Sequence, residues 1–162
     1  LFLKLIMNIF YKKTLMKIMN NGKTLSVAES CTGGKICNEM TKIPGISKIF
    51  LLGIVAYSNN SKISTLKINS KKLNKYGAVS KEIAKEMAIN ILKISKSDFS
   101  ISTTGIAGPK GFSYKKPIGL VYFAIASKKK IHIYKKNFKG SRLSIQKKST
   151  DFAFNILDKF IK

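Results

Sequence analysis

Serine, lysine and a single arginine are the residue types in this sequence that could carry out a hydrolytic reaction. Ser30 lies in a polar, glycine-containing run, residues 29–34, between an apolar segment and a helical pattern. At such a strand-to-helix turn, free backbone N–H groups and the helix dipole can stabilise a developing oxyanion. The run therefore supplies a candidate nucleophile together with candidate oxyanion donors. In the alternative interpretation, Ser30 and Thr32 only cap the helix.

A serine nucleophile needs a base, and the composition nearly excludes histidine. The only histidine, His132, lies in an alternating segment that is typical of a strand surface. Lysine is the natural substitute, as in Ser–Lys hydrolases. Burial and surrounding positive charge would both lower the pKa of such a lysine, so that it could accept a proton. Spacing alone does not distinguish Lys62 from the other lysines, and a solvated surface lysine is the alternative.

The basic residues indicate a solvated surface and one specific anion-binding group. The chain of 162 residues has 31 Lys and Arg against 7 Asp and Glu, a formal net charge of +24, and Arg142 is its only arginine. Proteins that read DNA or RNA usually use arginine for bidentate contacts, whereas these lysines are scattered over nearly every segment. We expect salt-sensitive adhesion to polyanions but no specific nucleic-acid partner. The guanidinium of Arg142 is suited to a phosphate.

Several other chemistries are not supported by the residues present. Cys31, Cys37 and His132 cannot build a disulfide framework or an ordinary four-ligand zinc site, so no metal is expected. Neither a GxxxxGK[ST] loop nor a GxGxxG turn occurs. Beside Ser30, we expect Cys31 to be a small buried residue and not a reactive thiol.

The amino-terminal segment predicts an amphipathic helix over residues 1–19. Its apolar start is interrupted by polar residues and is too short for a membrane span, and it lacks a secretory leader pattern. Four apolar residues recur at helical spacing and share a face: Met7, Tyr11, Leu15 and Ile18. We expect a protein without a membrane partner and a cytoplasmic location, with the residues before Met7 an upstream extension.

The remaining pattern alternates strands and helices. Strands are predicted at residues 24–28, 50–57, 100–104, 120–126 and 131–138, the last two forming a hairpin. Helices are predicted at about residues 34–40, in a short segment containing Lys62, from Ser80 to about Ile94, and from about Ser141 to the end. This order predicts one α/β domain over residues 1–162, with three α/β/α layers and a mixed, mostly parallel sheet.

Three polar segments follow strands of this sheet, at residues 29–34, 57–62 and 105–111, where ligands collect in such folds. Six ordered blocks then carry a family resemblance: VAESCTGG at 27–34, YSN at 57–59 with Lys62, GAVS at 77–80, TGIAGP at 104–109, KPIG at 116–119 and FKGSR at 138–142. With these blocks, the chain from about Asn20 to its end resembles the CinA carboxy-terminal domain family.

The resemblance implies a nicotinamide-nucleotide amidase, which converts nicotinamide mononucleotide to nicotinate mononucleotide and ammonia without a metal or organic cofactor. It implies that Ser30 is the nucleophile, Lys62 the general base, and Tyr57 a group that orients them or assists proton transfer. The implied substrate-binding residues are Thr32, Gly33, Gly34, Thr104, Gly105, Gly108 and Arg142, the last for the phosphate. A homodimer is also expected.

The sequence departs from the family pattern in two places and leaves other interpretations open. After the proline of the 104–109 block, the family commonly has an acidic or small residue and often a second glycine, whereas here Lys110 and Phe112 surround Gly111. Gln146 stands where a second basic residue often follows the arginine. These changes bear on substrate affinity, not on the reaction class. Tyr57 could be a half-buried strand residue and the 105–111 loop an ordinary turn. Alternative functions are a noncatalytic CinA-like or polyanion-binding protein, or an amidase for another small carboxamide.

Overall fold

The structure is a computed structural model that describes the backbone of residues 2–162 and the side chains of Met7 and residues 9–162. Leu1, the first residue of the predicted amino-terminal segment, lies outside the described residues. The helices are α1 (Phe2–Asn20), α2 (Lys35–Thr41), the 3-10 turn η1 (Ile46–Lys48), α3 (Asn59–Ser64), α4 (Ser70–Tyr76), α5 (Lys81–Ser95) and α6 (Arg142–Phe160). The strands are β1 (Leu25–Glu29), β2 (Phe50–Val55), β3 (Phe99–Gly105), β4 (Leu120–Ser127) and β5 (Ile131–Asn137).

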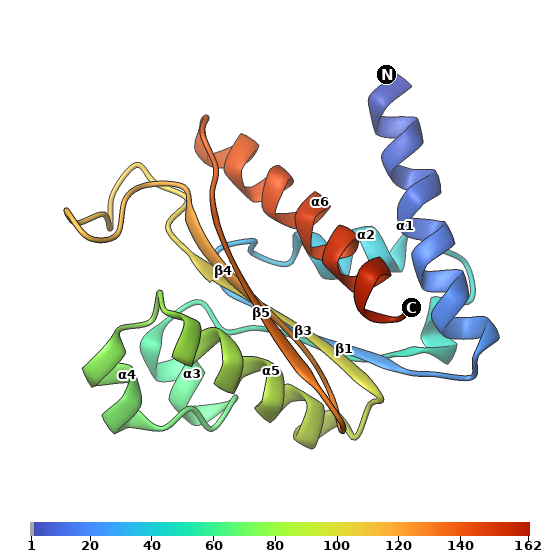
Figure 1. Cartoon of the computed structure of the whole chain (residues 1–162), viewed down its shortest axis with the longest axis horizontal. Helices are drawn as coiled ribbons and strands as arrows, with labels where there is room; N and C mark the ends of the chain where they lie inside the picture. Colours follow the sequence, from blue (N-terminus) through green and yellow to red (C-terminus); the bar gives the residue numbers. More distant parts are fainter. Residues whose placement is uncertain (1) are drawn as a thin grey trace.

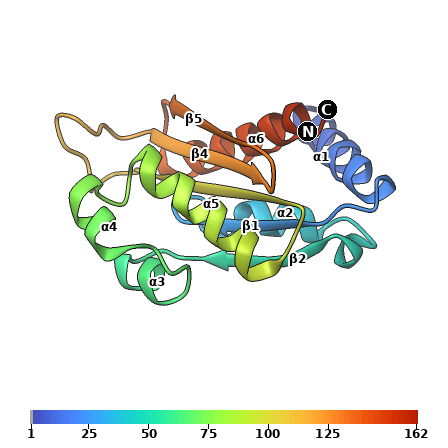
Figure 2. The ribbon, with the colours of Figure 1, turned by 60° about the horizontal axis from the view of Figure 1, so that its bottom comes forward.

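The five strands form one mixed sheet in the order β2-β1-β3-β4-β5 (Figure 2). Strand β1 pairs in parallel with both β2 and β3, whereas β4 pairs antiparallel with β3 and with β5. Only β4 therefore runs against the other four strands. The predicted mixed, mostly parallel sheet is confirmed.

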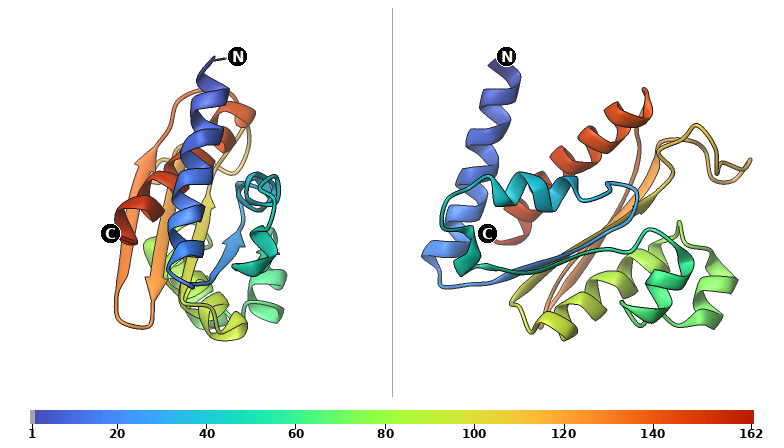
Figure 3. Two further views of the ribbon diagram at one scale, coloured as in Figure 1. Left: turned by 90° about the vertical axis from the view of Figure 1, so that its right-hand side faces the viewer. Right: turned by 180° about the vertical axis from the view of Figure 1, so that it is seen from behind.

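Helices cover both faces of this sheet, as predicted. Helices α1, α2 and α6 lie on one face, and α3, α4 and α5 lie on the other (Figures 1 and 3). Along β1, Leu25 and Val27 pack in the cluster on the α1/α2/α6 face, and Ala28 packs with α5. Both faces of β1, an interior strand of the sheet, are thus buried, which explains its continuous run of buried residues.

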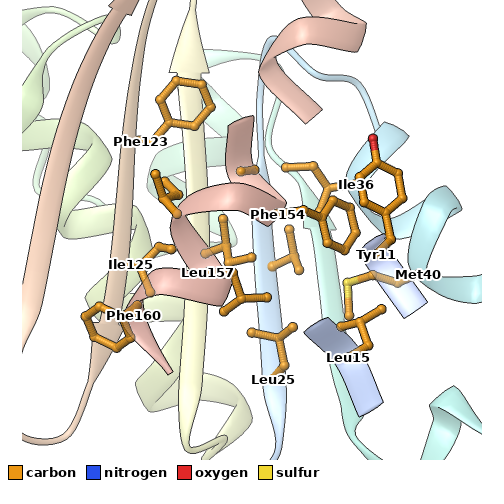
Figure 4. Packing of buried hydrophobic residues seen from close by; sticks show 14 of the residues in the cluster. Tyr11, Leu15, Leu25, Ile36, Met40, Phe123, Ile125, Phe154, Leu157 and Phe160 are labelled. Atoms are coloured by element: carbon orange, nitrogen blue, oxygen red, sulfur yellow. The ribbon is translucent and has the colours of Figure 1, made fainter. Parts of the chain in front are cut away.

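The larger apolar core lies between the sheet and helices α1, α2 and α6 (Figure 4). In α1, the predicted apolar face is confirmed, because Tyr11, Leu15 and Ile18 are buried. The ring of Tyr11 stacks on that of Phe154 from α6, with centroids 4.0 Å apart. Within residues 2–162, none of the helices combines the length and the apolar character needed to cross a bilayer.

Two short helices were not predicted from the pattern. Helix α4 buries only Leu73, so its sequence shows no repeat of apolar residues at helical spacing. The Asn69 side chain caps this helix. The turn η1 is only three residues long and follows Gly45. Strand β2 also ends at Val55, two residues earlier than predicted, because the chain then leads into the cap of α3.

The connections leave the central strands toward opposite faces. From β1 the chain passes through α2 to β2, on one face, and from β2 it returns through α3, α4 and α5 to β3, on the other (Figure 1). The segments that follow β1, β2 and β3 therefore all begin at the carboxyl edge of these three parallel strands, where ligands of doubly wound sheets bind. The polar segments predicted to hold the site begin at this edge.

Leu15→Ala tests how much the packing of α1 stabilises the fold. Leu15 is fully buried, so its truncation should lower the free energy of unfolding by about 2–5 kcal/mol. The control is Ile9→Ala on the same helix, because Ile9 is 60% exposed and its loss should cost less than about 0.5 kcal/mol. Urea unfolding followed by circular dichroism measures both, and equal losses would contradict the packing of α1 on the core.

Candidate active site

Ser30 and Lys62 are in direct contact at the carboxyl ends of β1 and β2. Lys62 donates from Nζ to Ser30 Oγ, at 3.0 Å, and to the carbonyl oxygen of Ala56, at 2.8 Å. Lys62 is 1% exposed and Ser30 is 7% exposed. Among the lysines whose side chains the structure describes, Lys62 is therefore the one that hydrogen-bonds to Ser30, which spacing alone could not establish.

Local structure explains why Lys62 points at Ser30. Helix α3 begins immediately after β2 with a capping box, in which the Ser58 hydroxyl accepts from the Ser61 amide and the Ser61 hydroxyl accepts from the Ser58 amide. This cap sets the direction of α3 and brings Lys62 back toward the sheet. The Ala56 amide also donates to the carbonyl of Glu29, at 2.8 Å, so the pairing of β1 with β2 continues up to the site.

Burial lowers the pKa of Lys62 below its ordinary value, because removal from water disfavours the charged ammonium; nearby Cys31 acts in the opposite direction. The sequence also led us to expect a contribution from surrounding positive charge. Among the described residues, burial alone accounts for the lowering. A neutral amine has a lone pair, so its contact with Ser30 can reverse, with the serine hydroxyl donating to Nζ.

The sequence suggested that the backbone amides at the amino terminus of α2 are free. In the structure, the Glu29 carboxylate occupies them. This buried carboxylate accepts from the amides of Gly34, Ile36 and Cys37, at 3.0, 3.2 and 2.9 Å. Its negative charge therefore already meets the helix dipole. In the described part of the chain, the amides of Ser30, Cys31 and Thr32 in this turn have no oxygen acceptor. Those of Cys31 and Thr32 lie against the Cys31 sulfur, where they act to lower the pKa of the thiol.

Arg142 links three segments at the edge of the site. Its guanidinium donates to the carbonyl of Gly108, at 2.6 Å, and to the hydroxyl of Tyr57. The Ser141 hydroxyl caps α6 directly before it. Tyr57 is 57% exposed and its hydroxyl contacts Arg142, whereas the family resemblance implied a role beside Ser30 and Lys62. Arg142 thus joins the start of α6 to the segments after β2 and β3.

The other predicted substrate-binding residues surround the site in different ways. The Thr32 hydroxyl is buried against that of Thr103, and the buried Thr104 hydroxyl donates to the carbonyl of Ala78. Both hydroxyl groups are therefore hydrogen-bonded within the protein. A ligand would meet these two residues through their backbone groups. Gly33 and Gly34 have φ values of +60° and +90°, so the turn after Ser30 needs glycine.

Two further glycines allow close packing beside the site. A Cβ at Gly105 would lie 2.6 Å from the Leu120 carbonyl oxygen, so the end of β3 needs a residue without a side chain. Gly108 has a φ of +78°, and a Cβ there would lie 2.9 Å from a methyl of Ile118. These positions shape the loop whose carbonyl holds Arg142.

Sequence reasoning missed two residues that touch the site. Gln146 was interpreted as a departure from the family, yet its buried amide donates to the carbonyl of Cys31, at 3.0 Å. The sequence contained one indication of this contact: Gln146 follows Arg142 by one helical turn, which places both side chains on one face of α6. Glu29 received no role, although its place at the end of a buried strand was visible.

Cys31 and His132 are not candidates for the reacting groups. Burial raises the pKa of the Cys31 thiol to about 12, so it stays protonated. The ring of His132 contacts Phe160 at the far end of α6, about 27 Å along that helix from Arg142. In the described part of the chain, no three His, Cys, Asp or Glu side chains gather as a metal site would require.

A mixed sheet of this topology, covered by helices on both faces and carrying a buried serine–lysine pair at its carboxyl edge, places the chain among the α/β proteins. The chain belongs to the CinA C-terminal domain family, whose profile matches residues 9–161. The chain is 31% identical to the competence/damage inducible protein CihA from Agrobacterium tumefaciens, with a TM-score of 0.93 over 96% of both chains. A CinA superfamily protein from Klebsiella pneumoniae is 26% identical, with a TM-score of 0.92 over 96% of this chain and 97% of that one.

Curated relatives are longer than this chain. A CinA-like protein from Endomicrobium trichonymphae is 49% identical over 140 residues, which are 86% of this chain and 33% of that protein. The chain therefore spans about a third of the length of the curated relatives it matches. The resemblance found in the sequence and the fold it implied are both confirmed.

The pH dependence of stability tests the burial of the Lys62 amine. The pKa of Lys62 is lower in the folded protein. At pH values between this folded pKa and the unfolded value of about 10.4, the unfolded chain therefore binds more protons at Lys62 than the folded protein does. The stability of the wild type relative to Lys62→Met should therefore rise with pH through the alkaline range, up to about pH 10. Urea unfolding across this range measures it, with the exposed Lys85→Met as control. A constant difference would count against the lowered pKa.

Proposed function

We propose that this chain hydrolyses the carboxamide of nicotinamide mononucleotide to nicotinate mononucleotide and ammonia. The observation that carries the proposal is the 3.0 Å contact between Ser30 Oγ and the buried amine of Lys62. Amide hydrolysis by acyl transfer needs a nucleophile, a group that accepts and returns a proton, and donors for the oxyanion. The family membership supports the reaction class, and Arg142 supports a phosphorylated substrate.

The neutral amine of Lys62 takes the proton of Ser30 as Oγ attacks the carboxamide carbon. The carbonyl π electrons move to oxygen, and a tetrahedral oxyanion forms. Lys62 then protonates the leaving nitrogen, so that the C–N bond breaks and ammonia departs, leaving an acyl ester on Ser30. A water molecule, deprotonated by Lys62, attacks this ester, and the proton returns to Ser30 as the carboxylate is released. One water is consumed for each ammonia formed.

Two amides after the nucleophile are the proposed oxyanion donors. The N–H groups of Cys31 and Thr32 follow Ser30 directly and have no oxygen acceptor among the described residues. Donors already held in place need no reorganisation when the charge develops, and removal of one such donor typically costs about 10²–10³ in rate. Gln146, through the Cys31 carbonyl, helps to hold this peptide.

Arg142 is the proposed phosphate ligand, and Tyr57 positions it. The guanidinium now donates to neutral oxygens of Gly108 and Tyr57, and a phosphate would replace or join these weaker acceptors. Because the Tyr57 hydroxyl contacts Arg142, we assign Tyr57 to orientation of the arginine and not to proton transfer. The phosphate would then anchor the substrate while the carboxamide lies at Ser30.

Ser30→Ala should reduce ammonia release from nicotinamide mononucleotide to the background rate, because Ser30 is the one nucleophile among the described side chains that hydrogen-bonds to Lys62. Lys62→Met should lower kcat by about 10²–10⁴-fold with little change in KM, since a general base acts in the transition state. Lys85→Met, which removes an exposed lysine, should retain full activity. A coupled ammonia assay measures all four proteins.

Two results would redirect the assignment. Activity that survives Ser30→Ala means that another nucleophile operates. A folded wild type that releases no ammonia from this nucleotide or other small carboxamides favours the noncatalytic alternative. Binding to nucleic acid then separates a specific partner, retained at physiological salt, from a bulk-charge effect that salt removes.

Arg142→Gln tests phosphate recognition by comparing two substrates. Loss of a charge-assisted hydrogen bond costs about 1.5–3 kcal/mol, so kcat/KM for the nucleotide should fall by about 10–100-fold. The matching nucleoside, which lacks the phosphate, should be hydrolysed equally well by both proteins. Lys148→Gln removes an exposed cation from the same helix and is the control. An equal loss for both substrates would show that Arg142 acts on the site and not on the phosphate.

A further inference from the structure

Glu29 is a fully buried carboxylate that the proposed reaction does not use. It ends β1 and lies next to Ser30, with no exposed surface. A carboxylate is costly to bury unless hydrogen bonds replace its hydration. Its two oxygens meet this need entirely with backbone amides, since Oε2 accepts from Gly34 and Ile36 and Oε1 accepts from Cys37.

These contacts close a ring around the turn that bears the nucleophile. The turn leaves β1 at Glu29, and its next residues are Ser30, Cys31 and Thr32. It passes through two glycines in the left-handed region and enters α2, whose first amides bind back to Glu29. Both ends of the turn are therefore tied to one side chain. Glycine at these two positions would otherwise leave the backbone free to adopt other conformations.

The ring also decides which amides are available for an oxyanion. A carboxylate is a stronger acceptor than a peptide carbonyl, so it occupies the amides at the start of α2. The amides of Cys31 and Thr32, earlier in the turn, have no oxygen acceptor in the described part of the chain. Without Glu29, the α2 amides would compete for acceptors and the turn could rearrange.

We infer that Glu29 is a positioning residue for the reaction: its carboxylate fixes the Ser30 turn so that the Cys31 and Thr32 amides face the developing oxyanion. The inference rests on the proposed function for its catalytic consequence, but the geometry of the turn can be tested without the nucleotide. The role differs from that of a helix cap alone, because it predicts a loss of rate in protein that remains folded.

Glu29→Gln keeps the size of the side chain but replaces one accepting oxygen by an NH₂ group. We expect kcat for ammonia release to fall by about 10–100-fold, because small displacements of catalytic groups cost rates of this order, with KM within about twofold. Glu39→Gln is the matched control, since Glu39 lies on α2, forms an exposed ion pair with Lys42 and carries the same charge. It should leave both constants unchanged.

A second measurement follows Ser30 without the nucleotide. A fluorophosphonate probe forms a bond to Ser30 Oγ with loss of fluoride and needs the same oxyanion donors, so its labelling rate should fall by the same factor in Glu29→Gln. Hydrogen exchange should accelerate in residues 30–37 and stay unchanged in α5. Should Glu29→Gln fail to fold, Glu29→Asp keeps the charge but shortens the reach, and we expect it to lower both rates.

The outcomes separate this inference from the proposed function. Folded variants at Glu29 that keep kcat and the labelling rate within about twofold of wild type would overturn the positioning role. If the wild type is labelled at Ser30 but releases no ammonia, the amidase proposal fails and the labelling rates alone decide on Glu29. A wild type that is neither labelled nor active overturns both.

Discussion

The buried contact between the Lys62 amine and the Ser30 hydroxyl is the constraint on which the arrangement of the site depends. An amine removed from water must find polar partners, and Lys62 has two, the Ser30 hydroxyl and the Ala56 carbonyl. Pairing of β1 with β2 sets the positions of both partners, because the Ala56 amide donates to the carbonyl of Glu29, the residue before Ser30. The sheet register thus determines the distance between the proposed nucleophile and base.

The rest of the site is arranged around this pair from distant parts of the chain. Helix α6 contributes Arg142 and Gln146 from one face. Arg142 donates hydrogen bonds to Tyr57 and Gly108, and Gln146 donates one to the carbonyl of Cys31, the residue after Ser30. The α6 helix is held in place by the large core under it (Figure 4). Packing far from the chemistry therefore sets the geometry of the candidate phosphate site.

Much of this architecture was predictable from particular residues. Alternation of apolar segments with helical patterns predicted the five strands and the longer helices, and the polar run after β1 identified Ser30. The uniqueness of Arg142 among the basic residues singled it out. Helix α4 was missed because it buries a single side chain, and Gln146 was taken for a departure because its partner, the Cys31 carbonyl, belongs to a segment far away in sequence.

By itself, the sequence determined the available chemistry: little histidine, cysteine or carboxylate, one arginine, and a serine at a strand-to-helix turn. It also determined the order of the elements, since periodicity and caps depend on neighbours in the chain. Only the tertiary structure decided that Lys62 is buried with a lowered pKa, that Glu29 takes the α2 amides, and that Tyr57 meets Arg142. These properties depend on desolvation and on hydrogen-bond partners that only folding brings together.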